Sequence, residues 1–306
     1  MTNYIIRRLL NLVLQVFLIA SLMFVIFRLL PGDPATLILG PSATQAEIDR
    51  LRESMGLNNN LATQYFDYLK QLLTGDLGYS TSYGQQVIEV LKPRIWPTVK
   101  LMLCSIVTAV VIGVPAGLLS GAYPHSKLSK GLLMTWVGLL AIPNFWLGLL
   151  LVQLFAVKLG WLPSIGYGSV AAMVLPTVAV AARLIALIAR MTRSSVLEIS
   201  SEDFVSFAQA KGLKNLRVLG RHILRPALPP VITMIGMQAG YLLGGSVVIE
   251  NLFSYPGMGQ LLLSAVSMRD YDLMQGITLF FVFAFLTINL IVDLGYGKID
   301  PRIRLE

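Results

Sequence analysis

The chain is poor in the residues from which reactive and metal sites are built. Among 306 residues it has one cysteine, Cys104, and two histidines, His125 and His222. One cysteine excludes an internal disulfide framework, and two separated histidines are too few for a histidine metal cluster. The motifs CxxC and HExxH are missing, as is a Gly-rich phosphate loop ending in Lys and then Ser or Thr. The sequence therefore offers no recognisable set of residues for nucleophilic catalysis or nucleotide binding.

Charged residues are also scarce. They make up 13% of this chain, against roughly 25% in a typical soluble domain, while 55% of its residues are hydrophobic and the mean hydropathy is +0.71. The apolar residues form long runs, which indicates an integral membrane protein. We predict six spans, each long enough to cross a hydrocarbon core of about 30 Å at about 1.5 Å per residue. They are Leu9–Phe27, Thr98–Ala122, Leu132–Val157, Val170–Ala189, Val231–Ile249 and Leu273–Leu294.

Two of the predicted spans have unusual features. Pro143 and Asn144 interrupt the third span and predict a kink there. The first span resembles a cleaved signal sequence, but its apolar run is too long, and LPGDP follows it instead of a small-residue cleavage motif. We therefore interpret residues 1–30 as an N-terminal segment and a permanent first span.

The short loops predict the orientation in the membrane. Lys and Arg gather in four segments that fall on one side of the six spans: the N-terminus, the loop with Lys127 and Lys130, the loop at about 194–230, and the C-terminus. Because cytoplasmic loops are enriched in Lys and Arg, both termini are predicted to be cytoplasmic. The same asymmetry accounts for the formal net charge of +8, so the charge gives no reason to expect nucleic acid binding.

The longest segment between spans, residues 31–97, is predicted to form a small helical subdomain on the extracytoplasmic side. Ala46–Met55 follows two candidate caps, Ser42 and Thr44, and Leu61–Leu73 repeats apolar residues at helical spacing. The subdomain either covers the helix ends or forms a docking surface for an extracytoplasmic partner. The spacing leaves both interpretations open.

A basic stretch, Glu202–Pro230, lies between two strongly apolar segments. A short helix is predicted at its start, with Ser200 as a cap and Gly212 at its C-terminal end. The residues predicted to share one face of this helix are Phe204, Phe207 and Ala208. Two phenylalanines on so short a helix favour insertion into a groove of a protein partner.

A second helix is predicted to follow, and three prolines are expected to break it before the fifth span: Pro226, Pro229 and Pro230. Its apolar side would consist of Leu216, Leu219 and Ile223. Its basic side would be a stripe of Arg217, Arg221 and Arg225. An amphipathic helix on the membrane surface, with its arginines on anionic head groups, explains this pattern, although a role in partner binding remains an alternative.

The stretch DFVSFAQAKGLKNLRVLGRHILRPALPPVIT resembles the cytoplasmic coupling loop of ABC importer permeases of the dipeptide, oligopeptide and nickel type. Further blocks in the family order are LLPGDPATLILG, IPNFWLGLLLVQLFAVKLGWLPSIGYG, GGSVVIENLFSYPGMGQLLLSAVSMRDYDLMQG and IVDLGYGKIDPRIR. The resemblance covers nearly the whole chain. The loop departs from the family at three positions: Ser206 and Phe207 stand where the family signature has Glu and Ala, and Pro226 stands where an Asn is usual.

This resemblance implies an all-α, multi-pass protein of the bacterial inner membrane, with six transmembrane helices and a permease core at residues 98–306. It also implies a heteromeric importer, which contains a second related permease, two ATP-binding subunits that hold ATP and Mg²⁺, and an extracytoplasmic substrate-binding protein. The cargo classes of such importers are dipeptides, oligopeptides, glutathione, nickel and metal chelates. The short helix of the coupling loop would enter a cleft of the ATPase. The coupling residues are then Asp203, Phe204, Phe207, Ala208, Ala210 and Gly212.

Some residues within the spans are candidates for the translocation pathway. The fifth span has glycines at four-residue spacing, Gly236, Gly240 and Gly244, which either pack against another helix or let the span slide. Arg183 lies in the fourth span, where inserting a charged side chain into the membrane costs at least about 2.5 kcal/mol on insertion scales. Its side chain therefore either snorkels to the membrane surface, forms an ion pair or meets a substrate carboxylate. The pathway candidates are Arg183, Met234, Met237, Gln238 and Gly240.

A stand-alone ion-coupled carrier or channel is the alternative function. Such carriers usually need carboxylates near the bilayer centre, and many show two related halves. Here Glu250 and Asp293 lie at span ends, and no fixed-period repeat or second six-span half is present. The ABC importer permease is therefore favoured, with Glu250 and Asp270 assigned to the outer mouth of the pathway.

Overall fold

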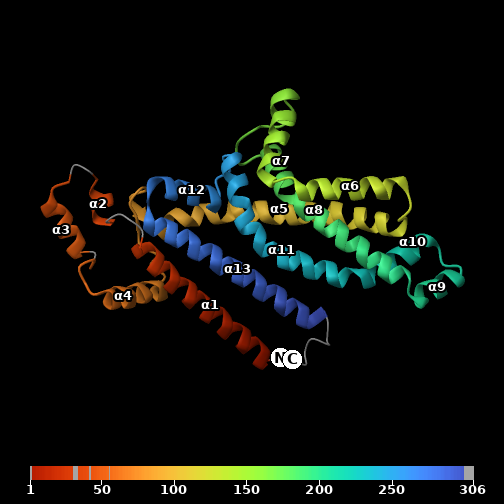
Figure 1. Cartoon of the computed structure of the whole chain (residues 1–306), viewed down its shortest axis with the longest axis horizontal. Helices are drawn as coiled ribbons and strands as arrows, with labels where there is room; N and C mark the ends of the chain where they lie inside the picture. Colours follow the sequence, from red (N-terminus) through yellow and green to blue (C-terminus); the bar gives the residue numbers. More distant parts are fainter. Residues whose placement is uncertain (1, 30–33, 41–42, 55, 300–306) are drawn as a thin grey trace. The chain divides into compact units, whose positions relative to one another are not determined.

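The computed structural model describes residues 2–29, 34–40, 43–54 and 56–299, of which 2–5, 34, 37–38 and 293–299 are described by their backbone alone. The predicted cap Ser42 and the carboxylate of Asp293 therefore lie outside the described residues. Within the described ranges the chain is helical except for loops and one short hairpin. It divides into two compact units, one of Met1–Trp96 with Gly257–Thr287, the other of Pro97–Pro256 with the chain from Ile288 onward (Figure 1).

The first unit begins with a long apolar helix and continues into a small subdomain. Its elements are α1 (Thr2–Leu29), α2 (Pro34–Leu39), α3 (Gln45–Ser54), α4 (Leu61–Thr74), the antiparallel hairpin β1 (Tyr79–Ser80) and β2 (Gln85–Gln86), the start of α5 (Val87–Ala122), α12 (Met258–Met268) and the start of α13 (Tyr271–Ile299). Both helices predicted from residues 46–73 are confirmed. Asn60 caps α4 by accepting a hydrogen bond of 2.6 Å from the N–H of Ala62, and Gly75 ends it at φ 77°.

The core of the first unit joins its two sequence segments. Val87, Leu91, Met258 and Leu273 are each at most 1% exposed and belong to one apolar cluster. The packing is close at Gly276, where an added Cβ would lie 2.6 Å from a methyl group of Val87. Helix α5 therefore begins eleven residues earlier than the predicted span at Thr98, because its first turns complete this core.

The second unit contains the remainder of α5 and the helices that follow it. These are α6 (Lys127–Ala141), α7 (Asn144–Leu151), the π-helical segment η1 (Val152–Lys158), α8 (Val170–Ser200), α9 (Asp203–Ala210), α10 (Asn215–Arg217), the π-helical segment η2 (Val218–Leu224), α11 (Arg225–Leu252) and the end of α13. The kink predicted at Pro143 and Asn144 is confirmed and is large, since the chain bends by 108° between Lys127–Ala141 and Asn144–Lys158.

Helices α5 and α8 approach each other along a row of glycines. An added Cβ at Gly117 would lie 2.5 Å from the carbonyl oxygen of Ala189, and one at Gly113 would lie 2.8 Å from a methyl group of Ile188. Small residues at four-residue spacing allow such contact between membrane helices. Gly121 continues the row against Val196, with an added Cβ 2.6 Å from its Cγ1. The glycine row of α5 was not among the sequence predictions, which placed this spacing in the fifth span.

The prolines before the fifth span do not break the helix, contrary to the prediction. The helical chain continues from Asn215 to Leu252, through Pro226, Pro229 and Pro230. A proline removes one N–H donor and crowds the carbonyl four residues before it. The π-helical segment η2 ends at Leu224, directly before these prolines, and contains His222, whose carbonyl Pro226 would crowd in regular α-helical geometry. Pro229 and Pro230 lie further inside α11.

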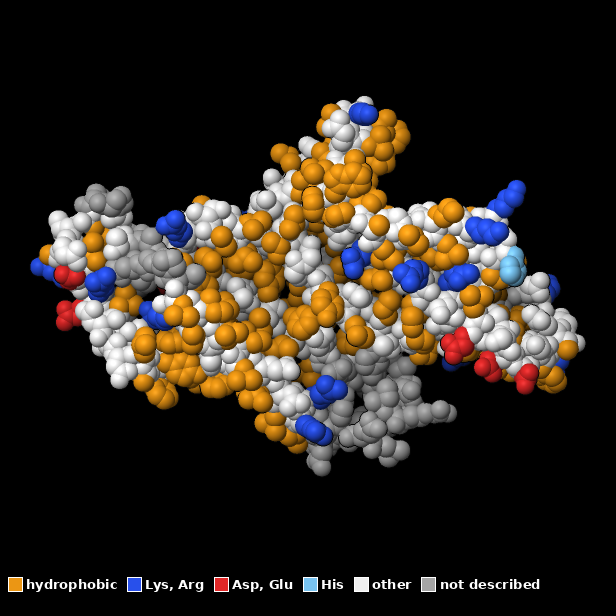
Figure 2. Space-filling view, in the orientation of Figure 1, with side chains coloured by type: hydrophobic (Ala, Val, Ile, Leu, Met, Phe, Trp, Pro, Cys, Tyr) orange, Lys and Arg blue, Asp and Glu red, His pale blue; other side chains and the backbone are white. Residues whose placement is uncertain are grey.

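The spans themselves agree with the prediction of six. Five helices are long and apolar enough to cross a membrane, and the bent pair at Lys127–Lys158 makes up to six. Many large apolar side chains face outward, for example Leu10 at 64% and Val111 at 65% exposure. Figure 2 shows hydrophobic side chains over much of the visible surface, with few charges among them. Lipid covers such a surface in a membrane protein.

Candidate functional site

A cavity of about 570 Å³ lies in the second unit, lined by residues of α7, α8 and α11. Three predicted pathway residues line it together: Arg183 from α8, and Met237 and Gln238 from α11. The structure therefore brings these three candidates to one place from two helices that are far apart in the sequence.

Arg183 is the one charged side chain among the described residues that line this cavity. Its neighbours in the sequence, Ala182 and Leu184, are 3% and 2% exposed, whereas Arg183 is exposed. Around this point α8 thus buries its apolar residues in the protein, and Arg183 lies at the cavity. No carboxylate lines the described wall, which instead presents the amides of Asn144 and Gln238. A cation beside amides and apolar side chains is suited to a ligand with an anionic end.

Two other pathway candidates lie outside the cavity lining. Met234 packs against an apolar cluster that includes Ile188 and Val231, and Gly240 is buried in α11. Gly236 is a packing residue, because an added Cβ would lie 2.5 Å from a methyl group of Val292 on α13. The cavity residues that sequence analysis missed are mainly apolar, but Asn144 and Tyr241 are polar. Asn144 had been noted only for its effect on the kink.

Glu250, assigned to the outer mouth, is fully buried in the second unit. Its Oε1 accepts hydrogen bonds from Thr98 Oγ1 at 2.8 Å and from Ser246 Oγ at 3.3 Å. Nearby, Tyr255 donates to the carbonyl of Pro97 at 3.1 Å. Burial raises the pKa of the Tyr255 phenol, and the neighbouring Tyr167 and Glu250 raise it further. These contacts fix the end of α11 to the start of the membrane part of α5.

Asp270, the other outer-mouth residue, is 1% exposed in the first unit. One carboxylate oxygen accepts from Ser80 Oγ at 2.6 Å and from the N–H of Ser82 at 3.0 Å. The other accepts from the N–H of Leu273 at 3.1 Å and so caps α13. The contacts of Asp270 thus connect the β1–β2 hairpin to the first turn of α13.

The predicted coupling helix exists as α9, but two details differ from the prediction. Ser200 does not cap it: Ser200 is the last residue of α8, its Oγ donates to Val196, and the residue before α9 is Glu202. Ala208 does not share an exposed face with the phenylalanines. Ala208 and Val205 are buried, at 5% and 1% exposure.

Helical geometry explains the second difference. At about 100° per residue, Phe204 lies about 70° from the centre of the Val205–Ala208 face, and Phe207 lies about 130° away. Their exposed fractions follow this order, at 45% and 61%. The buried face packs on an apolar cluster formed by the chain's own Val196, Val218, Ile223 and Ala227. Both phenylalanines are left on the outer side of α9.

The remaining predicted coupling residues lie on the surface around α9. Asp203 and Ala210 are exposed, and Gly212 follows the helix with φ 74°, a left-handed conformation that favours glycine. Lys211 Nζ lies 4.4 Å from the centre of the Phe207 ring, at cation–π distance. In the second predicted helix Leu216 is 85% exposed, so Val218, at 2%, takes the buried place that was expected for Leu216.

Comparisons with known proteins agree with this architecture. Residues 113–305 match the family described as binding-protein-dependent transport system inner membrane component, and residues 1–102 match the N-terminal domain of the same membrane component. The glutathione transport system permease protein GsiC of Escherichia coli strain K12 is 40% identical over 306 residues, which is 100% of both chains. GsiC of Shigella boydii serotype 4 is also 40% identical, with the same coverage.

Solved structures show the same fold at lower sequence identity. The MetNI methionine ABC transporter, in an inward-facing conformation, aligns with 70% of this chain and 97% of its own at a TM-score of 0.58 and 21% identity. An amino acid ABC transporter solved with histidines aligns with 69% of this chain and 94% of its own, at a TM-score of 0.51 and 16% identity. The chain belongs to the family of binding-protein-dependent transport system inner membrane components, and it is a multi-pass inner-membrane permease of the ABC importer class rather than a stand-alone carrier.

Proposed function

We propose that this permease carries glutathione or a similar short peptide, and that Arg183 meets a carboxylate of the cargo in the 570 Å³ cavity. The observation that carries the proposal is the convergence of Arg183, Met237 and Gln238 on one cavity wall. Relatives that are 40% identical over their full length are named as permeases for glutathione transport. Glutathione and short peptides combine carboxylates, which suit Arg183, with amides, which suit Asn144 and Gln238.

ATP binding and hydrolysis belong, in this proposal, to two partner subunits, and a second related permease completes the pathway. The exposed Phe204 and Phe207 of α9 would insert into a cleft of the ATPase, while Val205 and Ala208 hold α9 on the permease. Closure of the ATPases would move α9 together with the cluster beneath it. That cluster includes Val196 of α8, the helix that also carries Arg183. Movement of α9 would therefore reach the cavity through one continuous helix.

The subdomain at residues 31–97 would receive the substrate-binding protein on the extracytoplasmic side. Its exposed apolar side chains include Phe66 at 68% and Leu73 at 89%, both on α4. Large apolar side chains on an otherwise polar surface suit a protein partner. A pull-down of the substrate-binding protein by importers with wild-type or Phe66→Ser permease would test this role. The variant should bind the substrate-binding protein more weakly, and an affinity equal to that of the wild type would contradict the role.

The central test is uptake by the complete importer reconstituted in vesicles with its binding protein and ATP. Arg183→Gln should lower glutathione uptake at least about tenfold, as expected for the loss of one charge-assisted hydrogen bond. Arg183→Lys should keep part of the activity, because it retains the charge but not the planar fork. The matched control is Arg190→Gln, which removes an exposed arginine of α8 outside the cavity lining. Equal uptake by Arg183→Gln and Arg190→Gln would overturn the proposed role.

A further inference from the structure

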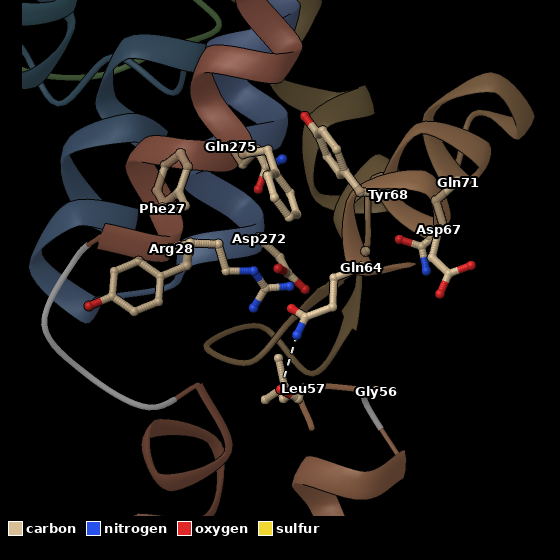
Figure 3. A pocket seen from close by; sticks show the side chains of 13 residues that line it. Phe27, Arg28, Gly56, Leu57, Gln64, Asp67, Tyr68, Gln71, Asp272 and Gln275 are labelled. Atoms are coloured by element: carbon tan, nitrogen blue, oxygen red, sulfur yellow. Dashed lines mark hydrogen bonds between the residues drawn. The ribbon is translucent and has the colours of Figure 1, made fainter. Parts of the chain in front are cut away.

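A second cavity, of about 290 Å³, lies entirely within the first unit (Figure 3). Side chains from α1, α4 and the first turns of α13 form its wall, together with the loop residues Gly56, Leu57 and Gly78. It shares no residue with the cavity around Arg183. A ligand here would therefore occupy a site different from the proposed pathway.

The cavity lies where two membrane spans end. Arg28 is in the last turn of α1, whose span is Ile6–Leu29, and the span of α13 begins at Tyr271. The rings of Phe27 and Tyr271 meet edge to face at this point, with centroids 6.0 Å apart. Aromatic and basic side chains gather at the ends of spans where the hydrocarbon gives way to lipid head groups. The cavity is thus at head-group level in the membrane.

The lining contains one cation and two carboxylates. Arg28 lies over the ring of Phe24, 5.3 Å from its centre, and Figure 3 shows the guanidinium turned toward Asp272 and Gln64. Asp67 adds a second carboxylate to the wall. The wall therefore presents more negative than positive charge, with both signs facing one cavity.

Gln64 adds an acceptor whose capacity the protein does not use. Its Nε2 donates to the carbonyls of Leu57 at 3.0 Å and Asn59 at 2.8 Å, which fixes the orientation of the amide. Its Oε1 is buried and has no hydrogen-bond partner among the described residues. Buried polar atoms are nearly always hydrogen-bonded, so this oxygen indicates that a donor from a ligand belongs beside it.

We propose that this cavity binds a small zwitterion that carries a primary ammonium group and, on a short linker, an anionic group. The ammonium donates to Gln64 Oε1 and to the Asp272 carboxylate, while the anionic group accepts from the Arg28 guanidinium. Two sources supply this chemistry at head-group level: the phosphoethanolamine head of a membrane lipid, and a free dipeptide in solution. The inference goes beyond the proposed function, because it assigns a ligand to a site outside the pathway cavity.

The lipid source is tested with the purified importer in nanodiscs of phosphatidylethanolamine or of phosphatidylcholine, with lipid retention measured by native mass spectrometry. The choline head has the same phosphate but its quaternary ammonium donates no hydrogen bond. The ethanolamine lipid should be retained about tenfold more strongly, in line with the loss of a charge-assisted hydrogen bond in the choline lipid.

The soluble source is tested by titrating dialanine and O-phosphoethanolamine into the importer in phosphatidylcholine nanodiscs. Saturable binding of dialanine, absent for N-acetyl-dialanine, would identify a free peptide as the ligand. Preference for the ethanolamine lipid without dialanine binding would identify the lipid. Both results support the site. Equal retention of the two lipids, together with no binding of either soluble zwitterion, would overturn it.

Variants of the lining residues test whether the ligand binds in this cavity. Asp272→Asn should reduce the observed preference about tenfold, because it removes a partner of the ammonium group. Arg28→Gln should instead reduce retention of both lipids about tenfold, because its partner is the phosphate that both carry. Asp49→Asn and Arg50→Gln are the matched controls, because both residues are exposed on α3 and neither lines the cavity. A preference left intact in Asp272→Asn, together with unchanged lipid retention in Arg28→Gln, would overturn the assignment even if the wild-type importer binds the lipid. The wild-type comparison needs no variant, so a variant that fails to fold does not remove the test.

Discussion

Ser80 Oγ donates a hydrogen bond of 2.6 Å to the Asp270 carboxylate across 190 residues of sequence, and both residues are at most 1% exposed. This pair connects the β1–β2 hairpin to the helix start at α13. Asp270, which the sequence assigned to the outer mouth, therefore has a structural role in the first unit, because its two oxygens accept hydrogen bonds from the hairpin and from the helix.

The first prediction concerns this pair. Asp270→Ala leaves the hydroxyl of Ser80 and two N–H groups without their acceptor, so we expect a loss of about 2–5 kcal/mol in the free energy of unfolding. Ser80→Ala should cost less, about 1–2 kcal/mol, because Asp270 keeps its backbone donors. Thermal unfolding of both single variants and of the double variant gives the coupling energy. A coupling energy near zero would show that the hydrogen bond does not stabilise the fold.

The second prediction concerns the contact between α5 and α8. Gly117→Ala places a Cβ 2.5 Å from the carbonyl oxygen of Ala189, so the helices must move apart, at a cost of about 1–3 kcal/mol. Gly138→Ala on α6 is the control, since no atom lies within 4 Å of its added Cβ. That substitution should be neutral, or stabilising by up to about 1 kcal/mol. Similar unfolding temperatures for the two variants would contradict the close contact.

Much of the helical framework was predictable because its signals are local. The amphipathic repeat of Leu61–Leu73 and the break at Pro143 are each contained in a few residues, and the structure has a helix and a bend there. Local signals failed where two elements interact. The prolines near Pro226 predicted a break, but the helix continues through them, with a π-helical segment directly before Pro226.

The sites were less predictable, for the same reason. Ala208 was grouped with the phenylalanines by spacing, yet the cluster below α9 buries it and leaves Phe207 outside. Which face of a helix is buried depends on the elements that the helix packs against, and the hydrophobic periodicity of the sequence does not identify those elements. The cavity shows a similar limit. Arg183 and Gln238 were candidates by chemical type, but only folding brings them together with Asn144.

The third prediction concerns pH. Burial raises the pKa of Tyr255 above its usual value near 10, so the folded state holds this proton more tightly than the unfolded chain does. The resulting stabilisation is fully present below about pH 10 and is lost as the pH rises toward the folded-state pKa. Tyr255→Phe should therefore lose less stability between about pH 10 and 11 than the wild type. Tyr123→Phe, which alters an exposed ring, should retain the wild-type slope. Parallel slopes for wild type and Tyr255→Phe would contradict the prediction.

The fourth prediction separates coupling from stability at α9. Phe207 is 61% exposed, so Phe207→Ala should change the unfolding temperature little. If the ring inserts into the ATPase, the same change should lower ATP-driven uptake at least about tenfold, as the loss of a buried aromatic anchor does at interfaces. Leu216→Ala removes an apolar side chain that is 85% exposed in the same loop and serves as the control. Equal uptake by the two variants would contradict a docking role for Phe207.

The last prediction concerns the backbone after α9. Gly212 has φ 74°, and no atom lies within 4 Å of the place where a Cβ would be, so conformational strain rather than steric contact limits substitution there. In Gly212→Val the left-handed backbone conformation should cost about 1–2 kcal/mol of conformational free energy. The backbone should therefore leave this conformation and turn the end of α9 away from its native direction. We expect the variant to insert in the membrane but to lose stimulation of the ATPase by the cargo-loaded binding protein.

Gly212→Asn should retain most of the stimulation, because asparagine adopts the left-handed conformation more readily. Gly220→Val, in the same loop at a helical glycine with open space, should remain coupled. Loss of coupling in all three variants would point to general sensitivity of the loop, whereas full coupling in Gly212→Val would contradict a role for this turn in transmitting ATPase closure.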